Sequence, residues 1–340
     1  MQSTRKHLAI GFTLVELLVA LALGLIVLLG LTVVFARNSG NHVELERTVR
    51  QVEGARFSLD LINEDLLHAG YFGDFNPNRL LPNAPAYQTP DPCATAVGLQ
   101  GWDTAATPVQ IPVAVQGIGP GAALACLSNR RPGTDAIVVR HAETGAPTAL
   151  AAATANNLYI QISRCSTQLA LTPIRAAAGQ SATLNLQLPD CATVNPVLRR
   201  LTQRTYYVAT CNDCIANDGI PTLKRVEMID GAMRTMSVAE GIENLQVEYG
   251  LDTNNDGRPD NFVTLGSGAI ATPAVAPNVW QNVVSVRVHL LARATDTTAG
   301  YSDVRTYQVG PDVSVSPTDS FKRTLLATTV RLNNVGGRRE

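Results

Sequence analysis

The sequence predicts an α+β protein in which one long N-terminal helix precedes a head of mainly antiparallel β-sheet. Three observations support this fold class: an apolar run at residues 12–36, a stripe of apolar residues that continues to about residue 68, and strand-like segments after residue 135. Spacings of three and four are typical of helices, and alternation with a period of two is typical of strands. No helix-length segment separates the strand-like ones, so the strands are expected to pair antiparallel.

The apolar run from Phe12 to Ala36 is long enough to cross a bilayer. A helix that rises about 1.5 Å per residue covers about 37 Å over this run. Arg5 and Lys6 precede it, and basic residues favour the cytoplasmic side, so the chain after Arg37 is expected beyond the membrane. An ordinary secretory signal peptide is the alternative, but it has a shorter apolar region and a small-residue cleavage site, which "VVFARNSGN" does not offer.

One carboxylate, Glu16, lies inside this run, five residues after Gly11. Placing a charged side chain within a bilayer costs free energy, so an acid at this position indicates a functional role. A plain single-pass anchor leaves the acid unexplained, and an acid that reaches back to the interface is the simple structural alternative. The stretch "GFTLVELLVALALGLIVLLGL" resembles the N-terminus of type IV prepilins, which carry a class III leader peptide.

This resemblance implies the roles of three residues. Residues 1–11 would be a leader that prepilin peptidase removes after Gly11, and the same enzyme would methylate the new N-terminal residue, Phe12. Glu16 would be a docking group that pairs with the α-amine of Phe12 on a neighbouring subunit. Because an unpaired buried charge is strongly destabilising, such a pair would favour the correct register between subunits.

The helix is predicted to continue from the transmembrane or filament-core segment at residues 12–36 into an amphipathic segment at 37–69 that packs on the head. Its stripe consists of Leu45, Val49, Val52, Ala55, Leu59, Ile62 and Leu66. Apolar residues at this spacing form the buried face of a helix. Gly70 is a candidate C-terminal stop, because glycine readily adopts the left-handed conformation there.

Residues 70–134 are expected to be a proline-rich connecting loop region, and residues 135–340 a β-rich head. Nine of the 19 prolines lie between Pro77 and Pro132. Strands are predicted at 136–141, 157–163, 182–188, 205–210, 222–228, 242–250, 283–291, 303–309 and 325–332. The order of "TYYVAT", "TLKRVEM", "GIENLQVEYGLD", "VVSVRVHLLAR" and "LLATTVRLNN" resembles PilW-type minor pilins over most of residues 200–333, so the expected fold is pilin-like.

The cysteines suit an oxidising compartment. They are Cys93, Cys126, Cys165, Cys191, Cys211 and Cys214. Six cysteines allow fifteen pairings, and sequence cannot choose among them. Pairing between nearest neighbours is the working hypothesis. The C-x-x-C of Cys211 and Cys214 also suggests a redox site, but Asp213 between them would raise a thiol pKa, which favours a structural turn. A zinc site is less favoured, because no second C-x-x-C or paired histidines occur.

The segment "DTNNDGRPD" resembles a calcium-binding loop. The candidate ligands, which match loop positions 1, 3, 5, 7 and 9, are Asp252, Asn254, Asp256, the backbone carbonyl of Arg258, and Asp260. Position 12 is Val263, so the usual bidentate glutamate is missing. Calcium is therefore a candidate cofactor, and a turn in which Asp and Asn bond the local backbone is the alternative.

No catalytic motif is found, so the protein is not expected to be an enzyme. The net charge of −1 and the scattered arginine pairs give no clear nucleic-acid site. The preferred interpretation is a minor pilin of a type IV pilus, a structural subunit that primes or caps pilus assembly through its N-terminal helix. The alternatives are a minor pseudopilin of type II secretion and a membrane-anchored periplasmic enzyme or thiol oxidoreductase.

The resemblance implies the partners and the location. The partners would be prepilin peptidase, other minor pilins, the major pilin and the inner membrane, with a tip adhesin as a further candidate. The chain would cross the inner membrane once, with its C-terminal head in the periplasm, and would then assemble into the pilus fibre or its tip. Twitching motility and cell adhesion are the processes that such a subunit would serve.

Overall fold

The computed structural model describes residues 13–77, 85–169, 174–179, 182–265 and 277–339. The chain divides into two compact units, Met1–Arg50 and Gln51–Glu340. The second unit, called the head below, contains the end of the first helix and all of the described sheets.

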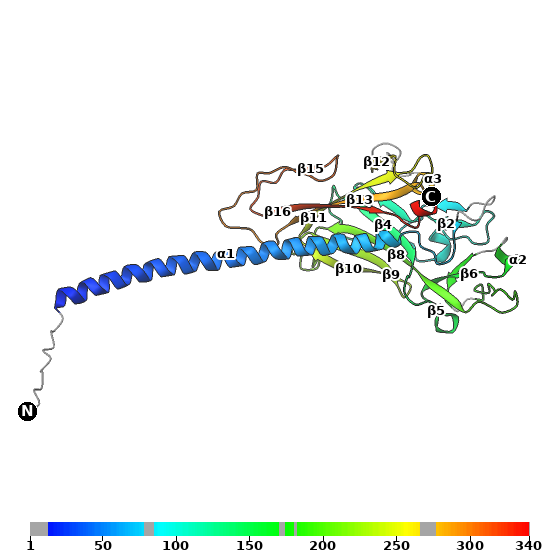
Figure 1. Cartoon of the computed structure of the whole chain (residues 1–340), viewed down its shortest axis with the longest axis horizontal. Helices are drawn as coiled ribbons and strands as arrows, with labels where there is room; N and C mark the ends of the chain where they lie inside the picture. The colour runs from blue at the N-terminus through cyan, green and yellow to red at the C-terminus, as the bar shows by residue number, and fades with distance from the viewer. Residues whose placement is uncertain (1–12, 78–84, 170–173, 180–181, 266–276, 340) are drawn as a thin grey trace, which may run out of the picture. The chain divides into compact units, whose positions relative to one another are not determined.

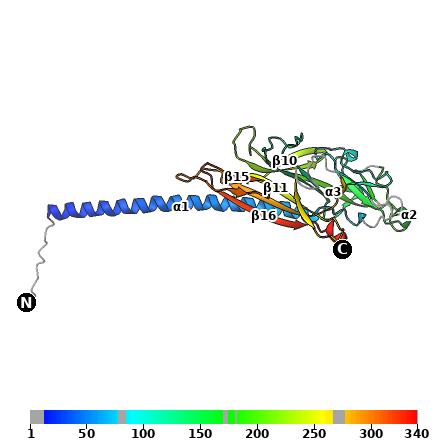
Figure 2. The same cartoon turned by 90° about the horizontal axis from the view of Figure 1, so that it is seen from above.

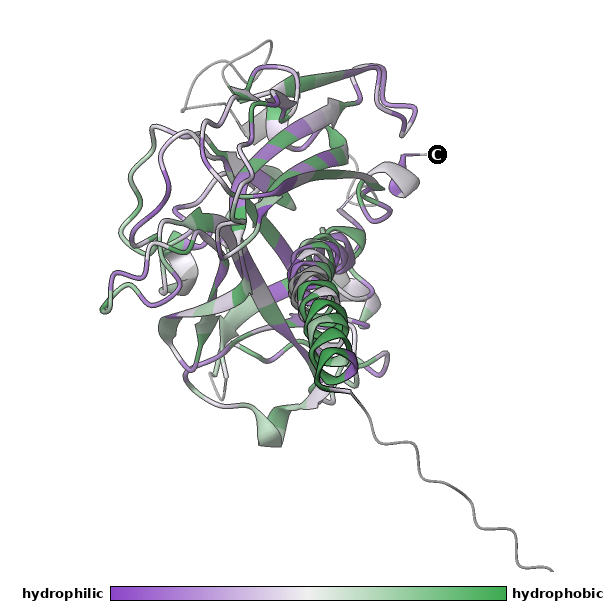
Figure 3. Ribbon diagram, turned by 90° about the vertical axis from the view of Figure 1, so that its left-hand side faces the viewer, coloured by the Kyte–Doolittle hydropathy of each residue, from purple (hydrophilic) through white to green (hydrophobic). Residues whose placement is uncertain are grey.

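Helix α1 runs from Leu14 to His68, within two residues of the expected bounds. Its segment Leu14–Phe35 has a mean hydropathy of 3.0 and is long and apolar enough to cross a membrane, as the green ribbon in Figure 3 shows. The helix ends where Gly70 adopts a φ of +74°. Because a left-handed residue is easily formed only by glycine, this position stops the helix as predicted.

The larger described sheet has eight strands (Figure 1). Its main path runs β10 (Ala232–Glu240), β9 (Thr222–Ile229), β8 (Val197–Ala209), β4 (Ala136–Ala142) and β3 (Val115–Ile118), all antiparallel. The short strands β5 (Thr148–Ala149), β6 (Leu158–Ile162) and β7 (Ile174–Ala178) extend it beside the first half of β8. Strand β8 is thus the central element of the sheet.

A second antiparallel sheet has the order β12 (Asn261–Thr264), β11 (Ile242–Leu251), β13 (Val283–Arg293) and β16 (Arg323–Arg331), and Figure 2 shows β11 and β16 from above. Two small pairs join β1 (Ala86–Gln88) with β2 (Gln110–Pro112), and β14 (Tyr307–Gln308) with β15 (Ser314–Val315). The short helices are η2 (Val97–Leu99), η3 (Leu150–Ala152), α2 (Ser166–Leu169), α3 (Pro277–Trp280) and η5 (Gly336–Arg338).

The main hydrophobic core lies between the C-terminal part of α1 and both sheets. Four residues of the predicted stripe are buried in it: Ala55, Leu59, Ile62 and Leu66. Residues from β4, β8, β11 and β13 belong to the same cluster. Full burial of a leucine or isoleucine side chain contributes about 1.5–3 kcal/mol, so this stripe attaches the helix firmly to the head.

The structure corrects the expected boundaries at several points. Strands β1, β2 and β3 lie within residues 70–134, so this region belongs to the head rather than being only a connecting loop. Strand β10 was not predicted, and only Tyr307–Gln308 of the predicted 303–309 strand is formed. The predicted strand at 182–188 is absent from the described residues, apart from a single bridge from Gln187 to Val194.

Three disulfides join Cys93 to Cys126, Cys165 to Cys191 and Cys211 to Cys214. These are the pairs that the nearest-neighbour hypothesis proposed. The first links the segment before η2 to the turn after β3, within the proline-rich region. The second closes a loop around β7, and the third closes a tight turn between β8 and β9.

Candidate functional site

The N-terminal end of α1 is closed by a reciprocal interaction between Thr13 and Glu16. The backbone N–H and the hydroxyl of Thr13 each donate to Glu16 Oε2 at 3.0 Å, and the backbone N–H of Glu16 donates to Thr13 Oγ1 at 3.3 Å. This is a capping box, which satisfies backbone donors that no helical carbonyl can reach. Gly11 and Phe12 lie outside the described residues.

The capping box places a negative charge at the positive end of the helix dipole, which is the favourable location for an acid. Thr13 was not named as a functional residue from sequence, although the T-x-x-E spacing before an apolar run was a signal for it. Glu16 is therefore held at the helix start by its own chain.

At the other end of α1, Asp65 connects the helix to strand β8. Its Oδ1 lies 2.5 Å from Nη1 of Arg204, and its Oδ2 accepts a hydrogen bond of 2.5 Å from the Tyr206 hydroxyl. His141 Nε2 on β4 lies 3.7 Å from Oδ1. Burial alone would raise the pKa of Asp65, but His141, the charge of Arg204 and the Tyr206 hydroxyl outweigh it and hold the pKa below its ordinary value.

Glu227 on β9 extends this charged cluster. Its carboxylate accepts from Arg204 Nε at 3.2 Å and lies within 4 Å of Arg200 and Arg225. A buried charge is tolerated only when it is paired and hydrogen-bonded, and here each acid has an arginine partner. The paired charges join α1 to β8 and β9, which is the arrangement of a structural anchor for α1.

The predicted calcium loop folds as a turn stabilised by its own side chains. Oδ1 of Asp252 accepts the backbone N–H of Asn255 at 2.6 Å, and Oδ2 accepts that of Gly257 at 2.9 Å. Asn254 Nδ2 donates to Asp256 at 3.2 Å and to Asp260 at 3.3 Å. Such bonds are those of the turn alternative.

A guanidinium lies beside the first candidate calcium ligand. Arg339 Nη1 lies 3.0 Å from Oδ2 of Asp252, whose side chain is buried. Burial would raise the pKa of Asp252, but the N–H of Gly257 and Arg339 hold it below its ordinary value. Within the described residues, no three His, Cys, Asp or Glu side chains form a group that could hold a metal ion. In this fold Asp252 is paired with a guanidinium rather than with a cation, and calcium binding stays a prediction of the sequence.

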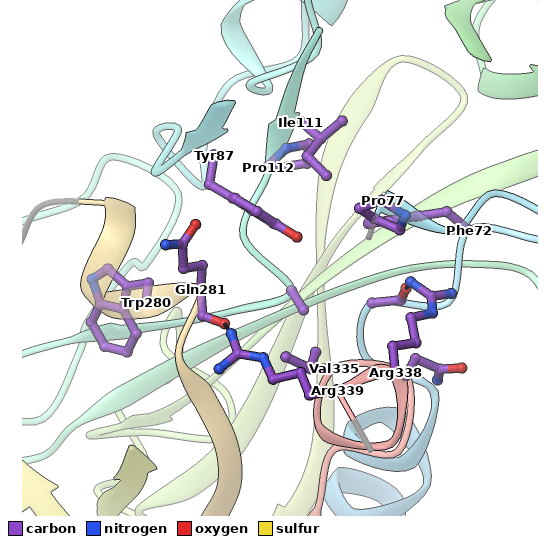
Figure 4. A pocket seen from close by; sticks show the side chains of 13 residues that line it. Phe72, Pro77, Tyr87, Ile111, Pro112, Trp280, Gln281, Val335, Arg338 and Arg339 are labelled. Atoms are coloured by element: carbon purple, nitrogen blue, oxygen red, sulfur yellow. Dashed lines mark hydrogen bonds between the residues drawn. The ribbon is translucent and has the colours of Figure 1, made fainter. Parts of the chain in front are cut away.

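Arg339 also borders a small cavity that Gly70, just after α1, helps to line (Figure 4). Tyr87, Trp280 and Arg338 line the same cavity, and Arg338 donates to the carbonyl oxygen of Gly70. The cavity volume is only about 30 Å³, which suits one or two water molecules rather than an organic ligand. This region therefore attaches the C-terminal residues to the end of α1.

The hydrogen bonds around the C-x-x-C turn of Cys211 and Cys214 also indicate a structural role. Asp213 accepts the backbone N–H groups of Ile215 and Ala216, and Asp218 accepts those of Asn212 and Asp213. A thioredoxin-like site instead places its cysteines at the start of a helix. Here the residues after Cys214 form turns, so the geometry favours a rigid surface loop.

Comparison with known families adds two matches. Residues 9–32 match the prokaryotic N-terminal methylation motif, and residues 205–334 match the type IV pilus-assembly protein W family, PilW. In these two segments the chain is similar to type IV pilins of the PilW type. The PilW match begins within β8 and ends after β16, so it includes the whole second sheet and the anchor residue Tyr206.

Two further comparisons complete the description of this PilW-type chain. No curated protein matches its sequence. A type IV-like pilin from Thermus thermophilus is similar in structure, with 12% sequence identity, a TM-score of 0.36, and coverage of 84% of this chain and 97% of that chain. The family assignment depends on the two sequence matches and not on this likeness.

Proposed function

We propose that this protein is a minor pilin of a type IV pilus, a non-catalytic subunit that primes or caps pilus assembly through α1. The observation that carries the proposal is the combination of a prepilin-type N-terminus with a PilW-type head on one chain. Helix α1 is continuous from the capping box at Thr13 to the anchor at Asp65. A subunit built in this way can enter a filament through its apolar half while its head remains folded.

In this proposal prepilin peptidase cleaves after Gly11 and methylates Phe12. Glu16 then exchanges its contact with Thr13 for the α-amine of a neighbouring subunit, because a charge that enters an apolar filament core needs a partner. The chain would lie in the inner membrane with its head in the periplasm before it joins the fibre or its tip. The partners would be other minor pilins and the major pilin.

The size of the head supports a minor role rather than a repeating one. Residues 86–200 add β1 to β7 and two disulfides ahead of the PilW-matched region. Every copy in a repeating fibre would have to accommodate this addition, whereas a subunit at the tip has free space around it.

Deletion of the gene, with surface pili, twitching motility and protein secretion measured in parallel, tests the proposal. Loss of pili and twitching with secretion intact is the expected result. Restoration by the wild-type chain but not by Glu16→Ala would show that the N-terminal helix carries the function. Loss of secretion with pili intact would instead identify a type II secretion pseudopilin.

A further inference from the structure

One cavity in the head lies between β6, the start of β8 and the loop after α1. Its volume is about 250 Å³. An engineered protein cavity of about 150 Å³ is sufficient to bind benzene, so this one has room for a larger organic group. It lies outside both family-matched segments, and it is called the β6–β8 pocket below.

One side of the β6–β8 pocket is aliphatic. Ile160 and Ile162 come from β6, and Val197 is the first residue of β8. Ile160 is buried, whereas Val197 is 40% exposed. An apolar surface of this kind favours a ligand with an aliphatic group, since contact removes both surfaces from water.

A positioned arginine lines the same pocket. Arg199 Nη1 donates to the carbonyl oxygens of Glu143 and Gly145, each at 2.9 Å, and its guanidinium carbon lies 5.5 Å from the centre of the Tyr71 ring. Among the residues that the structure describes, no acceptor is found for its Nε and Nη2. A guanidinium fixed at one nitrogen, with its other N–H groups available, suits the bidentate recognition of a carboxylate.

A second arginine makes the pocket more positive. Arg164 Nη2 lies 2.9 Å from Asp74 Oδ2, and both residues line the pocket. Their side chains are 55% and 73% exposed, and an ion pair this exposed contributes little to stability. Arg164 can therefore exchange Asp74 for another carboxylate at low cost. With two arginines and one aspartate, the pocket carries an excess positive charge.

We propose that the β6–β8 pocket binds a small organic anion in which a carboxylate is attached to a branched aliphatic group. The carboxylate would bind Arg199, with Arg164 as a second cation, and the aliphatic group would contact Ile160, Ile162 and Val197. This chemistry is shared by free branched carboxylic acids and by the C-terminal residue of a peptide. The site is independent of the N-terminal helix, so pilus assembly can proceed without it.

Isothermal titration of the full-length chain in detergent tests the proposal. The probes are 4-methylpentanoate, N-acetyl-L-leucine and a blocked tripeptide that ends in leucine, with leucinamide as the control that lacks a carboxylate. The carboxylates are expected to bind with a Kd of about 1 mM or tighter, and leucinamide is not expected to bind. A tripeptide that binds more tightly than the free acids would identify a peptide terminus as the source, and equal binding would identify the free acid.

Two variants locate the binding site. Arg199→Lys keeps the charge but loses the planar fork, and Val197→Asp places a like charge against the carboxylate at a partly exposed position, so both should fold. Each is expected to weaken carboxylate binding at least about tenfold, whereas the exposed control Arg56→Ala should not. Absence of binding to the folded wild-type chain at about 10 mM probe, or equal binding by all three variants, would overturn the proposal.

Discussion

The Tyr206 hydroxyl donates a hydrogen bond of 2.5 Å to Oδ2 of Asp65, which joins the last turns of helix α1 to the C-terminal half of strand β8. The two residues are 141 positions apart, so this bond forms only in the folded head. The pair lies inside the cluster that also contains Arg204 and Glu227. Because this cluster joins the end of α1 to the larger sheet, its loss should destabilise the head.

Replacement of Asp65 by alanine should destabilise the head by about 3 kcal/mol, because it leaves the partly buried Arg204 without its closest carboxylate. Unfolding of the full-length chain in detergent, followed by near-UV circular dichroism, measures the effect. Asp60→Ala is the matched control, since Asp60 is an exposed acid on the same helix and should change stability by less than about 0.5 kcal/mol. Equal stability of the two variants would show that the cluster does not anchor α1.

Asp135 should make the head less stable as the pH rises from about 4 to about 7. Burial raises the pKa of Asp135 to about 7, with Asp312 adding to this effect and the Val247 N–H and Arg130 opposing it. A carboxyl whose pKa is higher in the folded state than in the unfolded state contributes its full stability below the unfolded pKa. That contribution is lost as the pH rises through the folded pKa.

The variant Asp135→Asn tests this pH dependence. The amide oxygen can still accept the N–H of Val247, which lies 3.0 Å from the carboxylate in the native chain. The variant should be more stable than the wild type by about 3 kcal/mol at pH 8, with little difference at pH 4. Denaturant titrations at the two pH values measure the difference. A pH-independent difference would mean that Asp135 does not titrate in this range.

Processing should remove residues 1–11 and leave a mature chain that begins at methylated Phe12. Gly11→Leu should block cleavage, whereas Glu16→Ala should be cleaved normally but assemble poorly. Intact-mass measurement of the membrane-extracted protein, together with a count of surface pili, distinguishes these results. An uncleaved wild-type chain in cells with active prepilin peptidase would contradict the prepilin assignment.

Thr13→Ala separates the capping box from docking. The change removes one partner of Glu16 and should lower the stability of the helix start by about 1 kcal/mol, while the acid stays available to a neighbouring subunit. Assembly is therefore expected to fall less than in Glu16→Ala. If the two variants assemble equally poorly, the orientation of the acid by Thr13 is required for docking.

The 252–260 loop should respond weakly to calcium as long as Arg339 is present. The Arg339 guanidinium lies 3.0 Å from Asp252, so a cation would have to displace it. Millimolar Ca²⁺ and Mg²⁺ are expected to leave the Tm of the wild type unchanged. Arg339→Ala should lower the Tm, and Ca²⁺ should restore part of that loss. A wild-type increase with Ca²⁺ that Asp256→Ala abolishes and Arg258→Ala preserves would support the calcium site.

The fold could be predicted where the signal is local. The stop at Gly70, the buried stripe through Ile62 and the alternation along β13 each depend on neighbouring residues. The predicted strand at 182–188 is not formed, and side chains there accept two of the N–H groups that a neighbouring strand would otherwise bind. Gln161 accepts the N–H of Leu186, and Gln168 accepts that of Gln187, while the carbonyl oxygens of Leu186 and Gln187 accept from Asn195 and Arg164.

The candidate sites were harder to predict because their partners are distant in sequence. Nothing near Asp252 indicated that Arg339, 87 residues away, would lie beside it. The partners of Asp65 are likewise remote, and its position on the helix looked like that of any polar-face acid. Asp252 and Asp65 meet their arginine partners only in the folded chain. The sequence motif alone therefore could not show whether an acid binds a cation or forms an ion pair.

All six cysteines are paired, and all of them follow the apolar segment that ends at Phe35. A mature molecule therefore offers no thiol to a maleimide reagent, whereas a chain that has not yet met an oxidising compartment offers six. Maleimide labelling with and without prior reduction therefore distinguishes newly made chains, which react at once, from exported chains, which react only after reduction. No engineered tag is needed.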